Sequence, residues 1–293
     1  MGLFEKKGDP IFWKEDSHAE AELQRLNELR EHAPEEIARQ MDQDIKLIAA
    51  GLSGEKNVAY ELKNSHIPMY VLHDLYLVKD ELSAQIDYLV ITKKCSIVIE
   101  CKNLFGNIEI NSRGDFIRTL PQGRGYKKEC IYSPITQNQR HMELIRDLCL
   151  EAKGAVMGYF FDKWFPDFYK PIVVLANPKT VLNDRYAKKE VKAQVIRADH
   201  LIETIRELNR ASKSASSSDK QMKETAEKFL EWNQPQPMSF VEKYEKLLAQ
   251  QEKVCPLCGG KMVKRVAKKG AYAGEEFWGC ENFPHCRHME KII

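Results

Sequence analysis

The sequence predicts an α/β protein in which helices flank one mixed sheet, followed by a small C-terminal metal-binding domain. Apolar segments typical of strands alternate with amphipathic segments typical of helices between residues 17 and 208. A polar segment, 209–221, is typical of a linker. Half of the eight cysteines lie in residues 255–293, a segment so short that a bound metal would have to supply much of its folding energy.

The bulk composition is that of an ordinary globular protein. A chain of 293 residues, 43% of them hydrophobic and 30% charged, can hold one sizeable domain and a small one. The net charge of +2 neither requires nor excludes nucleic acid, because a local basic patch is enough to bind phosphates. The sequence shows neither the apolar run of a signal peptide nor a membrane span. We therefore expect a cytoplasmic protein without membrane contact, whose reduced cysteines favour metal binding over disulfides.

The first half of the chain predicts helices followed by a run of strands. Residues 17–48 are rich in Glu, Ala, Leu, Arg and Gln and predict one or two helices. Residues 51–65 predict the start of another helix, with Ser53 as its N-cap. Four segments with the apolar pattern of strands then follow one another, at 69–78, 85–92, 95–101 and 106–110.

The second half predicts helices around a single buried strand. Residues 133–150 predict a helix with Ser133 as N-cap and Pro134 in its first turn. A buried strand at 171–177, a helix at 198–208, and a charged helical segment beyond residue 221 follow. The preceding segment, 111–130, predicts an irregular insertion. Its basic residues could contact phosphates, although a solvated loop is the favoured interpretation: Arg113, Arg118, Arg124, Lys127 and Lys128.

Three charged residues lie in the predicted hairpin 85–103, where unpaired buried charges would each cost several kcal/mol. If 93–94 forms the turn, the register places Asp87 directly opposite Glu100, with Cβ atoms about 4.5–5.5 Å apart. Carboxylates that close repel unless one is protonated or a cation lies between them. Alternation places Lys102 on the face of Glu100, so all three side chains converge. Such oxygen ligands suit Mg²⁺ or Mn²⁺.

Two predicted helices can add polar groups to this site. Glu55 shares a helix face with Val58 and Leu62, so packing of that face on the sheet would bring in a third carboxylate. Gln137 and His141 begin a comparable stripe on the later helix. Gln137 could then reach the same site or a bound phosphate.

The arrangement resembles the PD-(D/E)XK nuclease superfamily, the restriction-endonuclease-like fold, and more narrowly its nuclease-related domain, NERD. The matching segments are "GLSGEKNVAYEL", "QIDYLVI", "IECKN" followed by "FGNIEI", and "SPITQNQRH", within residues 45–176. The resemblance implies that Asp87 and Glu100 bind the metal, that Lys102 is the catalytic lysine, and that Glu55 is the helix glutamate. His141 departs from relatives with a Gln-x-x-x-Tyr motif, because Tyr would stand there.

The activity that this resemblance implies is metal-assisted hydrolysis of phosphodiester bonds. One or two Mg²⁺ ions would stabilise charge on the phosphate and activate a water, while Lys102 would orient that water or offset developing charge. The non-functional alternative is that Asp87 ends a strand in solvent and that Glu100 and Lys102 form a surface ion pair.

The C-terminal segment carries two pairs of cysteines, and Gly-Gly follows the first pair. A Cys-x-x-Cys pair followed by a second pair is typical of tetrahedral zinc, and the four ligands would be Cys255, Cys258, Cys280 and Cys286. His285 and His288 are rival ligands, ranked only as substitutes. The segment resembles the C-terminal zinc ribbon of type IA DNA topoisomerases, including "FWGC" and "NFPHCRH".

Basic residues lie between the two cysteine pairs, and aromatic residues flank the second pair. Basic side chains with exposed aromatic rings suit single-stranded nucleic acid, through phosphate attraction and base stacking. Trp278 is the preferred stacking residue, whereas Phe277 and Phe283 could equally form the small core of the ribbon. The basic candidates are Lys261, Lys264, Arg265, Lys268 and Lys269.

The sequence thus predicts four parts: a helical segment (1–48), a nuclease-like domain (49–208), a linker with a helical segment (209–250) and a Cys₄ zinc ribbon (251–293). The leading hypothesis is a Mg²⁺- or Mn²⁺-dependent nuclease that acts on DNA, guided by its zinc ribbon. The alternatives are a catalytically inactive module that binds nucleic acid, and a module whose ribbon recruits a DNA-processing protein. The sequence leaves open DNA against RNA, strandedness, endo- or exonuclease action, pathway and oligomeric state.

Overall fold

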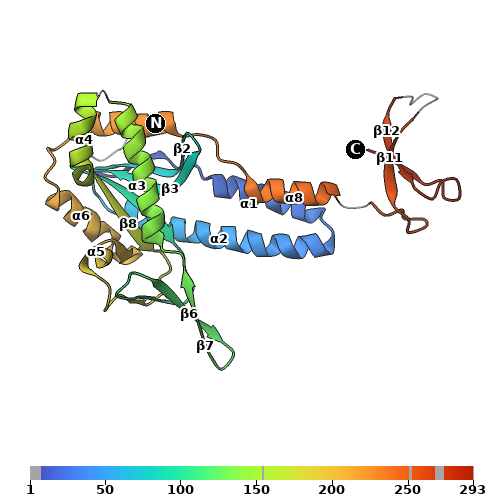
Figure 1. Cartoon of the computed structure of the whole chain (residues 1–293), viewed down its shortest axis with the longest axis horizontal. Coiled ribbons are helices and arrows are strands. Elements are labelled where there is room, and N and C mark those ends of the chain that lie inside the picture. The colour runs from blue at the N-terminus through green and yellow to red at the C-terminus, as the bar shows by residue number, and fades with distance from the viewer. Residues whose placement is uncertain (1–7, 154, 251–252, 268–273, 293) are drawn as a thin grey trace.

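The protein is described here from a computed structural model that covers residues 8–153, 155–250, 253–267 and 274–292. Its body is a mixed sheet with strand order β1-β2-β3-β4-β8-β10 (Figure 1). The pairs β2–β3 and β3–β4 are antiparallel, whereas β1–β2, β4–β8 and β8–β10 are parallel. The strands span Ile11–Lys14 (β1), Tyr70–Lys79 (β2), Leu82–Ile91 (β3), Ser96–Lys102 (β4), Tyr169–Leu175 (β8) and Val195–Arg197 (β10).

Helices cover both faces of this sheet, so the predicted α/β class is confirmed. On one face, α3, α4 and α7 bury apolar side chains such as Ile145, Phe165 and Phe229 against the strands. On the other face, α2 and α6 bury Val58 and Ile205. The helices span Glu35–Lys63 (α2), Pro134–Glu151 (α3), Ala155–Phe168 (α4), Leu201–Ala211 (α6) and Asp219–Trp232 (α7). A four-residue helix, α5 (Lys189–Lys192), and a 3₁₀ turn, Ala198–His200, lie before α6.

Helix α2 runs without interruption through the position where the sequence predicted a new helix. Ser53 is therefore not an N-cap, and the helix crosses the boundary expected after residue 48. The reason is tertiary, because the first half of α2 packs with two other helices around Leu26, Met41 and Tyr244. Those helices are α1 (His18–Glu31) and α8 (Ser239–Gln250).

The segment expected to be an irregular insertion forms a hairpin in a second sheet, with strand order β7-β6-β5-β9. The prediction failed because polar residues and glycines are interspersed among the apolar residues of the hairpin, so no regular apolar alternation marks its strands. Gly123 adopts a φ of 57° in the turn, where a left-handed conformation favours glycine. The strands are Asn107–Ile110 (β5), Phe116–Gln122 (β6), Gly125–Ile131 (β7) and Leu182–Asn183 (β9).

The polar segment 209–221 is packed against the first sheet. Helix α6 continues to Ala211, and the Ser217 N–H donates to the carbonyl of Lys93 at 2.6 Å. Helix α7 then buries Met222 and Ala226 in the core of the main domain. The expected linker is thus part of the domain, because backbone hydrogen bonds and the apolar face of α7 hold it in place.

The C-terminal segment forms a small antiparallel sheet with order β11-β12-β13, which lies beyond the end of α8 in Figure 1. Its strands span Met262–Val266 (β11), Glu276–Cys280 (β12) and Met289–Lys291 (β13). Among the described residues, no helix has both the length and the apolar character needed to cross a bilayer.

Candidate metal centres and nucleic-acid interface

The register of the β3–β4 hairpin is the one that the sequence predicted. Tyr88 pairs with Ile99 and Ile91 with Ser96. The ladder ends at Tyr88 and Ile99, and extending its register by one residue would place Asp87 opposite Glu100. The carboxylate of Asp87 accepts a hydrogen bond of 2.6 Å from the N–H of Cys101, which holds it at the strand end beside Glu100.

Glu100 is a buried carboxylate, and only one of its two oxygens has a hydrogen-bonding or ion-pair partner at close range. Only 2% of the residue is exposed. Its Oε1 lies 2.6 Å from Nζ of Lys102, whereas Oε2 has no hydrogen-bond partner among the described residues. The nearest ring nitrogen, Nδ1 of His141, is 3.5 Å from Oε2. Burial raises the pKa of Glu100 although Lys102 opposes this. A buried oxygen without a donor is a group that a bound cation can satisfy.

Asp87 is held in an environment that disfavours its charged form. Burial, followed by the negative charges of Glu100 and Glu55, raises the pKa of Asp87 well above its usual value. Carboxylates that lie close together repel unless a proton or a cation compensates their charge, and oxygen ligands of this kind suit a divalent cation. The charges of Glu55, Asp87 and Glu100 are therefore close enough to interact, and carboxylate oxygens are ligands that suit Mg²⁺ or Mn²⁺. Among the described residues, however, only the four cysteines of the C-terminal segment place three or more ligand atoms within 4.8 Å of one another.

Glu55 reaches the site because α2 passes very close to the sheet. At Gly54 an added Cβ would lie only 2.5 Å from Cβ of Asn103, so any larger residue would push the helix away. Two side-chain amides fix the helix there: Asn103 donates to the carbonyl of Ala50 at 2.6 Å, and Asn57 to that of Ala176 at 3.1 Å.

His73 is a site residue that the sequence analysis missed. Its Nε2 lies 2.8 Å from Oε2 of Glu55, and its ring stacks on Tyr88 with centroids 4.6 Å apart. The Tyr88 hydroxyl in turn donates to the carbonyl of Glu55 at 3.0 Å. Burial lowers the pKa of His73, but the hydrogen bond and charge of Glu55 outweigh it, so this pKa lies above the usual value. The available signal was a histidine inside a predicted buried strand.

Helix α3 brings Gln137 to the site from the other face of the sheet. Its Oε1 accepts a hydrogen bond of 3.0 Å from Nζ of Lys102. Ser133 caps the helix as predicted, by accepting the N–H of Thr136 at 3.4 Å. The buried Asn138 locks α3 across the sheet, because its amide donates to the carbonyls of β4 and β8 at 3.1 and 2.9 Å.

His141 lies on the same face of α3, one turn beyond Gln137. Burial, with a smaller contribution from Lys102, lowers the pKa of His141 to about 4. Its imidazole is therefore neutral at pH 7 and can donate or accept one hydrogen bond beside Glu100.

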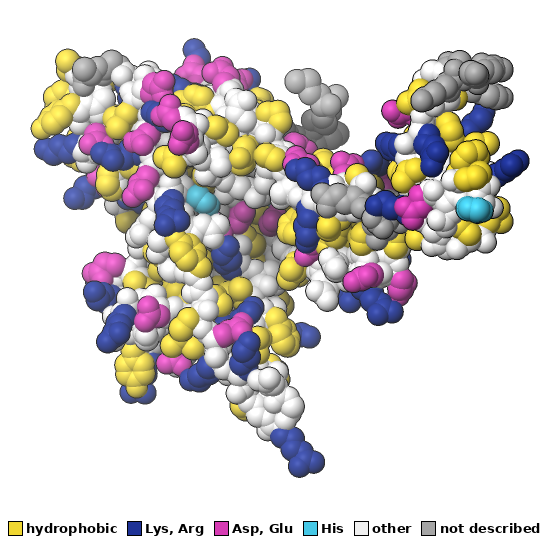
Figure 2. Space-filling view, turned by 45° about the vertical axis from the view of Figure 1, so that its right-hand side comes forward, with side chains coloured by type: hydrophobic (Ala, Val, Ile, Leu, Met, Phe, Trp, Pro, Cys, Tyr) yellow, Lys and Arg dark blue, Asp and Glu magenta, His cyan; other side chains and the backbone are white. Residues whose placement is uncertain are grey.

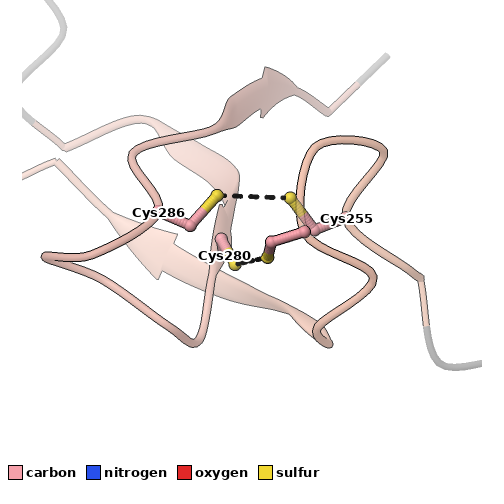
Figure 3. Close-up of side chains that lie close together, drawn as sticks. Cys255, Cys280 and Cys286 are labelled. Atoms are coloured by element: carbon pink, nitrogen blue, oxygen red, sulfur yellow. Dashed lines mark hydrogen bonds between the residues drawn. The ribbon is translucent and has the colours of Figure 1, made fainter.

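The four predicted cysteines of the C-terminal segment converge in space (Figure 3). All four sulfur atoms lie within 4.8 Å of one another. Cys255 and Cys286 are 3.6 Å apart between sulfurs, and Cys258 and Cys280 are 3.4 Å apart. The backbone of Gly260, with smaller side-chain hydrogen bonds, lowers the pKa of Cys258 to about 6, which favours the thiolate that zinc requires. Four clustered sulfurs fit a tetrahedral zinc ion. The ring of His288 contacts Glu290 instead, with Nε2 2.8 Å from Oε1.

The described part of the expected nucleic-acid interface lies on β11 and β12. Lys264 faces Trp278 across the ladder, with Nζ 5.4 Å from the ring centroid. Trp278 is half-buried and packs against the cysteine cluster. Phe283, by contrast, is 58% exposed. Lys261 and Arg265 belong to the same segment, whereas Lys268 and Lys269 lie outside the described residues.

Comparison with known proteins supports two separate assignments. Residues 50–176 match the family model of the nuclease-related domain, NERD. Residues 252–293 match the model of the topoisomerase DNA-binding C4 zinc finger. Searches of curated proteins and of solved structures gave no significant match. The chain therefore contains a nuclease-related domain and a topoisomerase-type C4 zinc ribbon.

Proposed function

We propose that this protein is a metal-dependent nuclease that hydrolyses DNA phosphodiester bonds and uses its zinc ribbon to bind single-stranded DNA. The observation that carries the proposal is the orphan oxygen of Glu100, which is buried next to Asp87 while Lys102 neutralises the other oxygen. A purely structural ion pair needs neither a second carboxylate beside it nor an unsatisfied oxygen. The nuclease-related domain supports a nuclease-like chemistry for this site.

Each residue of the site has a proposed role. Asp87 and Glu100 would hold Mg²⁺ or Mn²⁺, and Glu55 would add a carboxylate from α2. When bound, such an ion stabilises negative charge on the phosphate and lowers the pKa of an attacking water. Lys102 lies between Glu100 and Gln137, where its ammonium can orient that water or offset charge on the phosphate. Gln137 positions Lys102 and can contact the phosphate.

The ribbon is proposed to hold one Zn²⁺ and to present basic and aromatic side chains to single-stranded DNA. Zinc coordination would supply the folding energy that so small a sheet lacks. Lys264 and Arg265 are exposed on β11, where they can attract phosphates. Because the four thiols must remain reduced, we propose that the protein works in the cytoplasm.

A cleavage assay on single-stranded, duplex and branched DNA, with and without Mg²⁺ or Mn²⁺, tests the proposal. We expect ion-dependent cleavage that Lys102→Ala reduces by at least about 100-fold, a loss typical of one removed charge-stabilising group. The control is Lys163→Ala, which removes the same charge from an exposed position on α4.

The control variant should cut as the wild type does. Absence of cleavage by the wild type on every substrate, with intact DNA binding, would replace the proposal by an inactive binding module. If the wild type neither cuts nor binds DNA, the remaining function is recruitment of a DNA-processing protein. Residual activity in Lys102→Ala equal to the wild type would point to a contaminating nuclease.

A further inference from the structure

The β6–β7 hairpin projects from the second sheet as a free two-stranded ribbon (Figure 1). Its base is anchored by Phe116, which is fully buried. Every residue of 121–128 is exposed. Six residue steps separate Phe116 from Gln122, so the tip stands about 20 Å from the buried base. Because an isolated hairpin is marginally stable in water, this extension contributes little to the fold that carries it.

The charge of the hairpin is strongly biased. Residues 116–131 hold four basic side chains and a single acidic one, Glu129. Lys127 pairs with Glu129 at 2.8 Å, and Arg118 contacts the same carboxylate. At the tip, Arg124 has no ion pair or hydrogen bond among the described residues. Figure 2 shows Lys and Arg side chains at the end of the hairpin, which is where a negatively charged partner would meet them first.

An exposed aromatic ring accompanies these charges. Tyr126 is 80% exposed, although aromatic rings usually bury most of their surface. It pairs with Pro121 across the ladder, next to the turn. A phenol beside cationic side chains can contact sugars, base edges and thymine methyl groups, while the cationic side chains attract the phosphates. This combination favours nucleic acid as the partner.

The base of the hairpin lies beside the carboxylate site. Strand β5 begins at Asn107, shortly after Lys102 on the same chain segment. The second sheet packs through Ile108 and Phe116 in one cluster with Leu175 of β8 and Ile135 of α3. Ile135 is two residues before Gln137, so the hairpin and the site share the same end of the first sheet.

We propose that the β6–β7 hairpin is a duplex-reading element, which enters the major groove of double-stranded DNA beside the carboxylate site. The two strands of a ribbon lie about 4.8 Å apart, and the major groove, about 12 Å wide and 8.5 Å deep, admits such a ribbon. Arg124 and Tyr126 then meet base edges, while Lys127 and Lys128 meet phosphates. The choice of duplex DNA as the substrate of the site rests on the proposed nuclease function.

The test is a duplex-binding measurement by fluorescence anisotropy, without added Mg²⁺ or Mn²⁺, over a series of salt concentrations. We expect the triple variant R124A/K127A/K128A to bind duplex at least about tenfold more weakly at physiological salt. Its salt slope should be smaller by about 2 to 3, because each lost phosphate contact removes about 0.9. Methyl green, which occupies the major groove, should compete with the wild type, whereas the minor-groove ligand netropsin should not.

The matched control is K163A/K213A/K220A, which removes three exposed positive charges outside the second sheet. It should keep the duplex affinity of the wild type. Tyr126→Ala should weaken duplex binding without changing the salt slope, because it removes no charge. Equal duplex affinity and slope for the hairpin triple variant and the wild type would overturn the inference and leave a protein partner for the hairpin. Competition by netropsin alone would also overturn it.

The binding and cleavage experiments test the hairpin inference and the nuclease function separately. Duplex binding that depends on the hairpin, in a wild type that cuts no DNA, supports the inference and removes the nuclease function. If the wild type cuts duplex DNA but its duplex binding does not depend on the hairpin, the nuclease function is supported and the hairpin inference is overturned.

Discussion

The ammonium of Lys102 lies 2.6 Å from Oε1 of Glu100, while the other oxygen of that buried carboxylate receives no hydrogen bond from the described residues. The charge of Lys102 partly compensates the negative charge of this carboxylate. The orphan oxygen beside Asp87 remains costly unless a cation or a proton satisfies it. A cation that bound this oxygen would therefore raise the stability of the domain.

Metal binding should require both facing carboxylates. We expect Asp87→Asn and Glu100→Gln each to weaken Mn²⁺ binding by at least about tenfold, because each removes one charged oxygen ligand. Isothermal titration calorimetry with Mn²⁺ measures this without any cleavage reaction. Glu31→Gln, an exposed change on α1, serves as the control and should bind as the wild type does. Unchanged affinity in both site variants would remove the metal site.

Asp87→Asn should stabilise the metal-free protein at neutral pH. The raised pKa of Asp87 means that ionising it costs stability at every pH above the unfolded value, near 3.8. The amide oxygen of Asn can still accept from Cys101. Thermal unfolding across pH tests the sign: the advantage of the variant should be absent below the unfolded pKa and grow as pH rises toward the raised folded pKa. A variant less stable than the wild type at pH 7 would contradict the assignment.

His73 should act by positioning Glu55. We expect His73→Ala to lower kcat more than His73→Gln, because Gln can still donate a hydrogen bond to the carboxylate. The raised pKa of His73 implies that its charged pair with Glu55 stabilises the fold fully below about pH 6.5 and that this stability is lost as pH rises through the folded pKa. The stability gap between wild type and His73→Gln should therefore shrink on going from pH 6 to alkaline pH. A gap independent of pH would mean that His73 is only packed.

The ribbon should bind one zinc ion and fold independently of the main domain. Deleting residues 251–293 should leave thermal unfolding of the main domain unchanged, because α7 and α8 remain. Single-strand affinity and its salt slope should both fall, since fewer counterions are released. Metal analysis of the reduced full chain, with Cys258→Ser as the zinc-deficient comparison, checks the site. A zinc-free wild type would exclude it.

Two aromatic residues of the ribbon should separate stacking from packing. Phe283→Ala should cost about 1–3 kcal/mol of single-strand affinity if a base stacks on its exposed ring, with zinc retained. Trp278→Ala should do the same only if its indole also stacks, and should otherwise weaken zinc retention because the ring packs on the cysteine cluster. Zinc content and anisotropy measured on both variants decide between the two roles. Wild-type affinity in both would exclude stacking by these residues.

The sequence predicted those elements whose side chains carry local signals of helix or strand structure. The strands β2 to β5 and the helix α3 were predicted because apolar alternation, a Ser cap and a Pro in the first turn are local signals. Strand β1 and helix α4 went unpredicted. The hairpin β6–β7 was mistaken for an irregular loop because its exposed strands carry no apolar period. Ser53 was mistaken for a cap because the packing that continues α2 comes from α1 and α8.

By itself, the sequence determined the β3–β4 register and with it the placement of Asp87 opposite Glu100, because a short turn between two apolar strands fixes which residues face each other. It also determined the cysteine cluster, because zinc ligands follow a short spacing rule. Only the tertiary structure decided that His73 holds Glu55, that Gly54 lets α2 approach the sheet, and that α7 completes the core. Those contacts join residues far apart in the chain, and their energies depend on distances that no local pattern contains.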